Sequence, residues 1–184
     1  MTPAEQHAQD AAAFTALVES AAPDDWDRPS PVEGWTARDV VGHLVEWLPG
    51  FLERTGATLP PVDMGDVAAA WRQRAGDVQT LLETEGDREF TSEMFGTLTI
   101  AAALERFYIA DIWMHSWDLG KALGRDVDLG EDRCRGALEG MRPMDDVLRQ
   151  GGQFGAKVEV PADASAQDQF IGFIGRDPAW SPGA

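Results

Sequence analysis

The segment from Thr97 to Leu123 constrains the fold most, because it carries the strongest helical pattern in the chain. Its apolar residues recur at the spacing of one helix face, and no proline interrupts it. Gly124 follows directly and suits the position after a helix end, where the left-handed conformation is common. Such a helix needs partners that cover its apolar side, so the fold depends on what the other segments form.

Five other segments show helical spacing and predict further helices. They are Thr2–Ser20, Ala37–Arg54, Asp63–Glu85, Gly130–Gln150 and a short one over Ser165–Ile174. Thr36 is the expected N-cap of the second, with Asp39 as the acid of a capping box. Pro49 and Pro143 are expected to kink, shorten or break the helices that contain them.

The apolar stripes also predict which side chains point inward. In the helix over residues 63–85 these are Val67, Trp71, Ala75, Val78, Leu81 and Leu82. The loop over residues 24–35 is rich in Pro, Asp, Ser and Gly but contains Trp26 and Trp35. Two indoles are unusual in a solvated loop, so we expect them to pack the loop onto the helices.

Little strand is expected. Phe90, Met94 and Phe95 suit one short extended piece, and the segment Val158–Val160 suits another. Internal repeats, low-complexity segments and shifts of composition are absent from the sequence, so residues 1–184 are expected to form a single domain. The prediction is a mostly all-α fold, an antiparallel helical bundle with extra short helices and at most a short strand pair.

The charge of the chain argues against two classes of partner. The sequence has 184 residues, with 15 Lys and Arg against 32 Asp and Glu, a formal net charge of -17. Nucleic-acid phosphates and anionic membrane surfaces attract clustered cations, so we expect neither as a partner. Hydrophobic residues make up 43 % of the chain, which indicates a globular protein rather than a disordered one. The sequence gives no functional reason for the strong acidity.

The cysteine content limits the disulfides and metal sites that the chain can form, and the N-terminus indicates where the protein is located. Cys134 is the single cysteine, which excludes an intrachain disulfide and a thiolate-rich zinc site. We expect it to be a packed helix residue. The first ten residues lack the basic and apolar regions of a signal peptide, and apolar runs are too short to span a membrane. The expected location is the cytoplasm.

Two histidines and one aspartate form the candidate site. Asp111 and His115 lie four residues apart on a strong helix, so their side chains share one face and can chelate a cation. His43 lies within the apolar stripe of the helix over residues 37–54 and is expected to point inward. Two imidazoles and one carboxylate on facing helices would make a divalent-metal site.

A structural alternative stands beside the metal. Asp111 and His115 can form a simple hydrogen-bonded pair, and His43 can be a core histidine satisfied by a backbone carbonyl. The stronger H-E-x-x-H motif is absent from the sequence.

Neighbouring polar residues have less specific interpretations. Asp118 can orient an imidazole, but we favour a structural role at the helix end, paired with Lys121 or Arg125. Glu46 is a further candidate ligand or base, and the structural alternative for it is a solvated helix position. His7 is expected to be an exposed polar residue.

Two sequence blocks carry a resemblance to a known family. "SPVEGWTARDVVGHLVEW" and "IADIWMHSWDLGKALGRD" resemble the DinB-like metal-binding bundles. More narrowly, the chain resembles small actinobacterial proteins related to the N-terminal domain of mycothiol-dependent maleylpyruvate isomerase. The tail "VEVPADASAQDQFIGFIGRDPAW" resembles the C-terminal segment of stand-alone members, so the likeness spans nearly the whole chain.

The resemblance implies a fold and a metal site. It implies a DinB-like four-helix bundle with additions, which binds zinc or, as the alternative, nickel through His43, Asp111 and His115. The isomerase has Glu where Asp111 stands here, and it has a further C-terminal domain that this chain lacks. Both differences put the isomerase reaction itself in doubt. Homodimers are implied by resemblance only.

The functional expectation is a metal that activates a low-molecular-weight thiol. Three protein ligands leave coordination positions open, so a thiol such as mycothiol could bind there and attack an electrophilic substrate. The protein would then be a transferase or isomerase. Trp35, Trp47 and Trp113 are candidates for lining the cofactor pocket, although core packing is favoured for at least two of them. The alternatives are a non-catalytic metal-binding protein with a structural, sensing or partner-binding role, and a metal-free bundle with a Trp-rich interaction surface.

Overall fold

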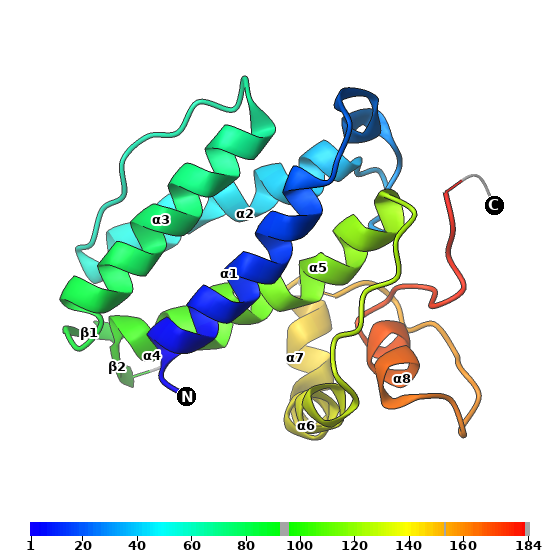
Figure 1. Cartoon of the computed structure of the whole chain (residues 1–184). Coiled ribbons are helices and arrows are strands. Elements are labelled where there is room, and N and C mark those ends of the chain that lie inside the picture. The colour runs from blue at the N-terminus through cyan, green and yellow to red at the C-terminus, as the bar shows by residue number, and fades with distance from the viewer. Residues whose placement is uncertain (93–95, 153, 183–184) are drawn as a thin grey trace.

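Most of the chain is helical, as Figure 1 shows for a computed structural model that describes residues 1–92, 96–152 and 154–182. The α-helices are α1 (Pro3–Glu19), α2 (Ala37–Leu52), α3 (Val67–Glu85), α4 (Ile100–Leu104), α5 (Ala110–Ala122), α6 (Glu131–Met141), α7 (Asp145–Gln150) and α8 (Ala166–Phe173). Short 3-10 turns are η1 (Pro23–Asp27), η2 (Glu53–Thr55) and η4 (Arg142–Met144), and η3 (Glu105–Ile109) is a π-helical turn. The predicted mostly all-α fold is confirmed.

Capping residues set the beginnings of the first two helices. At α2 the Thr36 hydroxyl accepts a hydrogen bond from the backbone N–H of Asp39, whose carboxylate accepts one from the N–H of Thr36. Thr2 and Glu5 form the same reciprocal pair at α1. These side chains satisfy N–H groups that the first helical turn leaves without partners. The predicted Thr36 cap is therefore confirmed.

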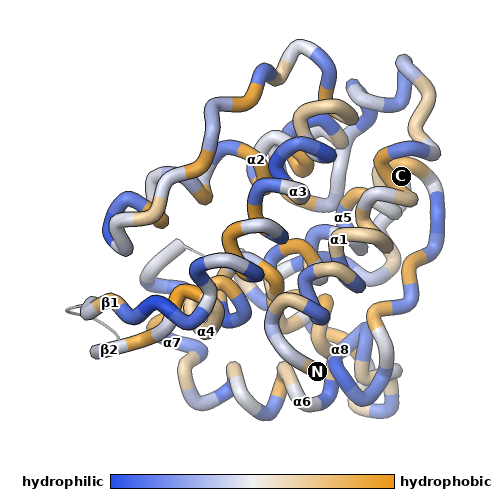
Figure 2. Tube along the Cα trace, turned by 60° about the vertical axis from the view of Figure 1, so that its left-hand side comes forward, coloured by the Kyte–Doolittle hydropathy of each residue, from blue (hydrophilic) through white to orange (hydrophobic). Residues whose placement is uncertain are grey.

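The four longest helical segments enclose the first hydrophobic core. Helix α1 contacts α3 and α5, and α2 contacts the same two helices. Trp71 of α3 is fully buried against Phe14 of α1, and its indole N–H donates to the Thr15 hydroxyl over 2.8 Å. The predicted inward positions of α3 are buried or half-buried, and the loop residues Trp26 and Trp35 pack against this core as expected. Figure 2 shows hydrophobic residues interspersed with hydrophilic ones along the helices.

A second hydrophobic cluster lies on the other side of α5. Its buried members are Trp113, Trp117, Leu129, Cys134, Leu138, Phe170, Ile171, Phe173 and Ile174. Helix α6 contacts α8 in this cluster, and Figure 1 shows both beside α5 and α7. Helix α5 also supplies Ile112 and Leu119 to the first core. It therefore lies between the two clusters, and Cys134 is packed as predicted.

The predicted helix over residues 97–123 differs from the structure at its start. Residues 96–99 form strand β2 (Gly96–Thr99), which pairs antiparallel with β1 (Glu89–Ser92). Thr99 instead caps α4, because its hydroxyl accepts from the N–H of Ala102. The prediction of helix over residues 97–99 was therefore wrong, because β-branched residues favour a strand and Thr suits an N-cap. Phe90 lies in β1, while Met94 and Phe95 fall outside the described residues.

The other predicted boundaries fared unevenly. Helix α2 continues past Pro49 to Leu52, whereas the break at Pro143 is confirmed, since η4 separates α6 from α7. Gly124 adopts the predicted left-handed conformation, with φ of 69°. The expected strand over residues 158–160 is wrong: this segment has no regular structure and instead lies against α8, where Val158 N–H donates to the Gly172 carbonyl. Among the described residues, none of the helices has both the length and the apolar character that crossing a lipid bilayer requires.

His7 is buried, so its predicted exposed position was wrong. Its Nδ1 lies 2.7 Å from Gln79 Oε1, and the Gln79 amide nitrogen donates to the Ala4 carbonyl and to Glu83. The Gln79 oxygen therefore accepts, and His7 Nδ1 donates. Burial lowers the pKa of His7, and the partners Gln79 and Asp10 oppose this only in part. Most residues next to His7 in the sequence are polar, so they gave no sign that α3 covers this face of α1.

Replacing His7 with Asn should remove a pH-dependent part of the stability. Because the pKa of His7 is lower in the folded protein, the unfolded chain binds protons more readily as the pH falls below about 6.5. The stability that neutral His7 contributes is therefore present above that pH and lost as the pH falls. We expect the difference in unfolding free energy between parent and His7→Asn to shrink between pH 7.5 and 5.5. Urea unfolding at each pH measures this difference, and a constant value would contradict the assignment.

Candidate metal centre

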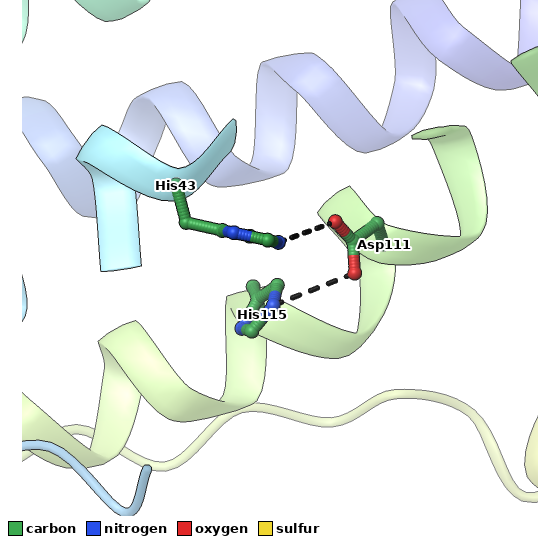
Figure 3. A group of neighbouring side chains, drawn as sticks. All are labelled: His43, Asp111 and His115. Carbon is green, nitrogen blue, oxygen red and sulfur yellow. Dashed lines mark hydrogen bonds and ion pairs between the residues drawn. The ribbon is translucent and has the colours of Figure 1, made fainter. Parts of the chain in front are cut away.

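Helices α2 and α5 bring the three predicted ligands together (Figure 3). His43 Nε2 lies 3.0 Å from Asp111 Oδ2, and His115 Nε2 lies 3.4 Å from Asp111 Oδ1. The two imidazole rings have centroids 5.0 Å apart and meet edge to face. One carboxylate thus faces the Nε2 atoms of both histidines, in the arrangement that the i, i+4 spacing predicted.

The spacing of these atoms suits a divalent cation. The three ligand atoms all lie within 4.8 Å of one another. Two atoms each about 2.0–2.1 Å from a tetrahedral zinc ion are separated by roughly 3.3 Å. The separation is 3.4 Å between His115 Nε2 and Asp111 Oδ1, and 3.0 Å between His43 Nε2 and the other oxygen, Oδ2, so both are near that value. Two imidazole nitrogens and a carboxylate oxygen are also the donor types that zinc and nickel accept.

Asp118 holds the other side of the His115 ring. Its Oδ2 lies 2.8 Å from His115 Nδ1, and the guanidinium of Arg176 contacts both of its carboxylate oxygens at 3.3 Å. Burial would raise the pKa of Asp118, but the hydrogen bond from His115 and the charge of Arg176 outweigh it and lower this pKa. The ionised Asp118 accepts a hydrogen bond from the Nδ1–H group of His115. This bond orients the ring so that Nε2 faces Asp111. Carboxylates commonly orient metal-binding histidines in this way.

The favoured role of Asp118 at the helix end was therefore wrong. Its partners are His115 and Arg176, whereas Lys121 pairs with Asp126 and Arg125 donates to the Ser20 carbonyl.

The charges around His115 shift the pKa of its imidazole. Burial lowers it, but the negative charges of Asp111 and Asp118 prevail and raise it above its ordinary value.

Two of the three predicted tryptophans adjoin the ligands. Trp47 Nε1 donates to Asp111 Oδ2 over 3.1 Å. Trp35 stacks on His115, with centroids 5.8 Å apart, and also lies 5.0 Å from the His43 ring. Trp113 instead stacks on Phe170 in the second hydrophobic cluster. The structure therefore places Trp35 and Trp47 around the triad and Trp113 in core packing.

Exposure shows the side from which a ligand can reach the triad. The side chain of His43 is 31 % exposed, whereas those of Asp111 and His115 are 17 % and 7 % exposed. Trp35 and Trp47 are half-buried beside His43. The triad is therefore most exposed to solvent at His43. Glu46 is exposed, in agreement with the alternative of a solvated helix position.

Arg176 was missed because its sequence context gives no sign of a contact with the candidate ligands. It lies 58 residues after Asp118, in the C-terminal tail that resembles stand-alone family members and outside the two blocks that carry the ligands. The available signal was the buried helical position of Asp118, since a buried carboxylate requires a positively charged or hydrogen-bonding partner. That signal predicts a partner without saying which of the arginines supplies it.

The fold and site define a mostly helical protein whose two facing helices converge on a two-histidine, one-carboxylate cluster. Residues 7–77 match the family model of the mycothiol maleylpyruvate isomerase N-terminal domain, which confirms the predicted family resemblance over that segment. The match includes His43, Trp35 and Trp47 and ends before Asp111.

Relatives extend the likeness over nearly the whole chain. The uncharacterized proteins Rv0738 and MT0763 of Mycobacterium tuberculosis are each 26% identical to it over 180 residues. Each alignment covers 94% of this chain and 96% of the relative. No solved structure matches the chain significantly.

Proposed function

We propose that the protein binds one divalent ion, zinc or alternatively nickel, through His43, Asp111 and His115. The observation that carries this proposal is the convergence of both Nε2 atoms on one carboxylate, with His115 held from behind by Asp118. Hydrogen bonding at Nδ1 directs the lone pair of Nε2 toward the ion, which a histidine placed only for packing would not need.

We further propose that the bound ion serves a reaction of a low-molecular-weight thiol, mycothiol by family resemblance. Three protein ligands leave at least one coordination position open, as catalytic sites do. The metal, when bound, would lower the pKa of a coordinated thiol and hold it as the nucleophilic thiolate. The electrophile would be an activated double bond, an epoxide or a carbon–halogen centre, which makes the protein a transferase or isomerase.

The chain's own residues would position the reactants. Trp47 donates to Asp111 and fixes the carboxylate, while Asp118 fixes the His115 ring. Trp35 packs against both histidine rings, stacked on His115 and tilted against His43. His43 is the most exposed of the three side chains, at 31 %, so the thiol would reach the ion from its side. These contacts orient the ligands before any substrate arrives, which reduces the reorganisation that binding would cost.

A non-catalytic metal-binding role is the second candidate, and one observation favours it. Asp111 already faces His43, His115 and the Trp47 N–H, so these polar groups satisfy one another across α2 and α5. An ion added here would tie the two helices together without any reaction. Unfolding of the metal-free protein under mild conditions would favour that structural role, since a structural ion contributes directly to folding.

Cobalt substitution should distinguish a thiol-binding site from a closed one. Metal-free protein, prepared without an affinity tag, is loaded with one equivalent of Co²⁺ and titrated with mycothiol. Thiolate coordination is expected to add a sulfur-to-cobalt charge-transfer band that the thiol alone with metal-free protein does not give. The His43→Ala variant serves as the control and should lose the band. A cobalt spectrum unchanged by thiol would contradict the proposed thiol chemistry while leaving the metal site standing.

A further inference from the structure

We infer that Arg176 is a positioning residue for the metal site, and that the C-terminal segment over residues 166–177 supports the site through it. The inference rests on the proposed metal binding. It adds a residue of the C-terminal tail, which lies outside the two ligand-bearing blocks and outside residues 7–77, the part that matches the family model. Arg176 contacts Asp118, which in turn contacts His115, so two hydrogen-bonded contacts connect Arg176 to a proposed metal ligand.

The contact between Arg176 and Asp118 has the geometry of a specific pair. Nε faces Oδ1 and Nη2 faces Oδ2, each at 3.3 Å, so the planar guanidinium engages both carboxylate oxygens. The side chains are 12 % and 1 % exposed, which shields the pair from water. A buried carboxylate left without its arginine is costly, so its side chain would move toward a new partner. That movement would release the ring of His115.

The backbone of the segment fixes where Arg176 can reach. The N–H of Arg176 donates to the Ile171 carbonyl, and its Nη1 donates to the Ile174 carbonyl over 3.1 Å. The guanidinium is therefore tied to the C-terminal end of α8 as well as to Asp118. Its position follows α8, which packs on α6 in the second hydrophobic cluster.

Two glycines allow α8 to sit this close to the preceding segment. A Cβ at Gly172 would lie 2.6 Å from the Val158 carbonyl oxygen, and one at Gly175 would lie 2.8 Å from backbone atoms of Gly155. Gly175 also has φ of 89°, which disfavours other residues. The close packing at these two glycines fixes the position of the segment, and the Arg176 side chain extends from it to Asp118.

Arg133 offers a matched control because it makes a similar contact away from the triad. Its Nη1 and Nη2 donate to the two carboxylate oxygens of Asp10 over 2.7 Å each. It also joins the second cluster to the helical core, with its guanidinium 4.4 Å from the Trp113 ring centroid. Loss of Arg133 should loosen the same group of helices without releasing Asp118 or His115.

Zinc affinity of the parent, Arg176→Met and Arg133→Met proteins tests the inference by competition with a chromogenic chelator. We expect Arg176→Met to bind zinc about 10- to 100-fold more weakly, the range found when partners of metal ligands are removed. Arg133→Met should stay within about threefold of the parent by the same reasoning, since its contact does not reach a ligand. Arg176→Lys should fall between parent and Arg176→Met, because one ammonium cannot engage both oxygens.

Hydrogen exchange of the parent protein adds a readout that needs no variant. Coupling is reciprocal, so zinc should slow amide exchange at residues 174–177 if Arg176 supports the site. Equal zinc affinity in parent and Arg176→Met, equal weakening in Arg176→Met and Arg133→Met, or unchanged exchange would each overturn the inference. Failure of the parent itself to bind zinc or nickel would instead overturn the proposed function, and the inference with it.

Discussion

Replacing His115 with alanine should lower the zinc affinity about 100- to 1000-fold. Structural zinc sites with four ligands have apparent binding free energies of about 10–16 kcal/mol, or roughly 3 kcal/mol per ligand. His115 is the most buried of the three predicted ligands, so water cannot readily replace its nitrogen. Elemental analysis of protein purified without a tag should find about one equivalent of zinc or nickel in the parent. The variant should retain little after dialysis.

The buried His7 provides the control for this experiment. It is as well enclosed as His115 but lies between α1 and α3, where its partner is Gln79. His7→Asn should therefore keep the parent's metal content. Absence of metal from the parent, even after reconstitution, would contradict the metal assignment. His43, Asp111 and His115 would then be polar packing between α2 and α5.

Replacing Trp71 with alanine should cost about 3–5 kcal/mol of unfolding free energy, the range measured for large-to-small core substitutions. Trp71 is fully buried, packs 4.5 Å from Phe14 between ring centroids, and donates to the Thr15 hydroxyl. The substitution removes that hydrogen bond and leaves a cavity at the centre of the first core. Denaturant unfolding with the same probe for parent and variant measures the loss.

Trp26→Ala is the comparison for Trp71→Ala. Trp26 lies in η1 and is only half-buried against the same core. Its removal opens a site that water can enter, so the loss should be about 1–2 kcal/mol, near the average for point substitutions. Similar losses for both variants would mean that Trp71 does not occupy the centre of the core.

Helix positions followed from the sequence because each depends on local chemistry. The pair Thr36 and Asp39 marks the beginning of α2, and the apolar spacing of α3 predicts the burial of Trp71. The three candidate ligands could be predicted for the same reason. Asp111 and His115 share a helix face by spacing, and His43 lies on an inward stripe.

Contacts between distant segments could not be predicted in this way. The burial of His7 depends on α3 covering it, and a polar local sequence does not reveal this. The partner of Asp118 lies in a segment whose course is set by packing of α8 on α6. Residues 158–160 have an alternating, strand-like pattern but pack against α8, and no strand in the described part of the chain pairs with them. Each of these contacts joins segments that are far apart in the sequence. Which segments meet depends on how the helices pack, and local sequence patterns do not determine this.

The π-helical turn over residues 105–109 affects how related sequences should be aligned. A π turn holds one more residue than an α turn between hydrogen-bonded groups, so it absorbs one residue without rotating the helices on either side. Deleting one residue there would give a continuous α-helix that still presents Asp111 and His115 to α2. The count of residues from the β1–β2 hairpin to this pair can therefore vary by one while the site is preserved. An alignment of relatives should permit a gap of one residue at this turn, before it judges whether the acid and histidine are present.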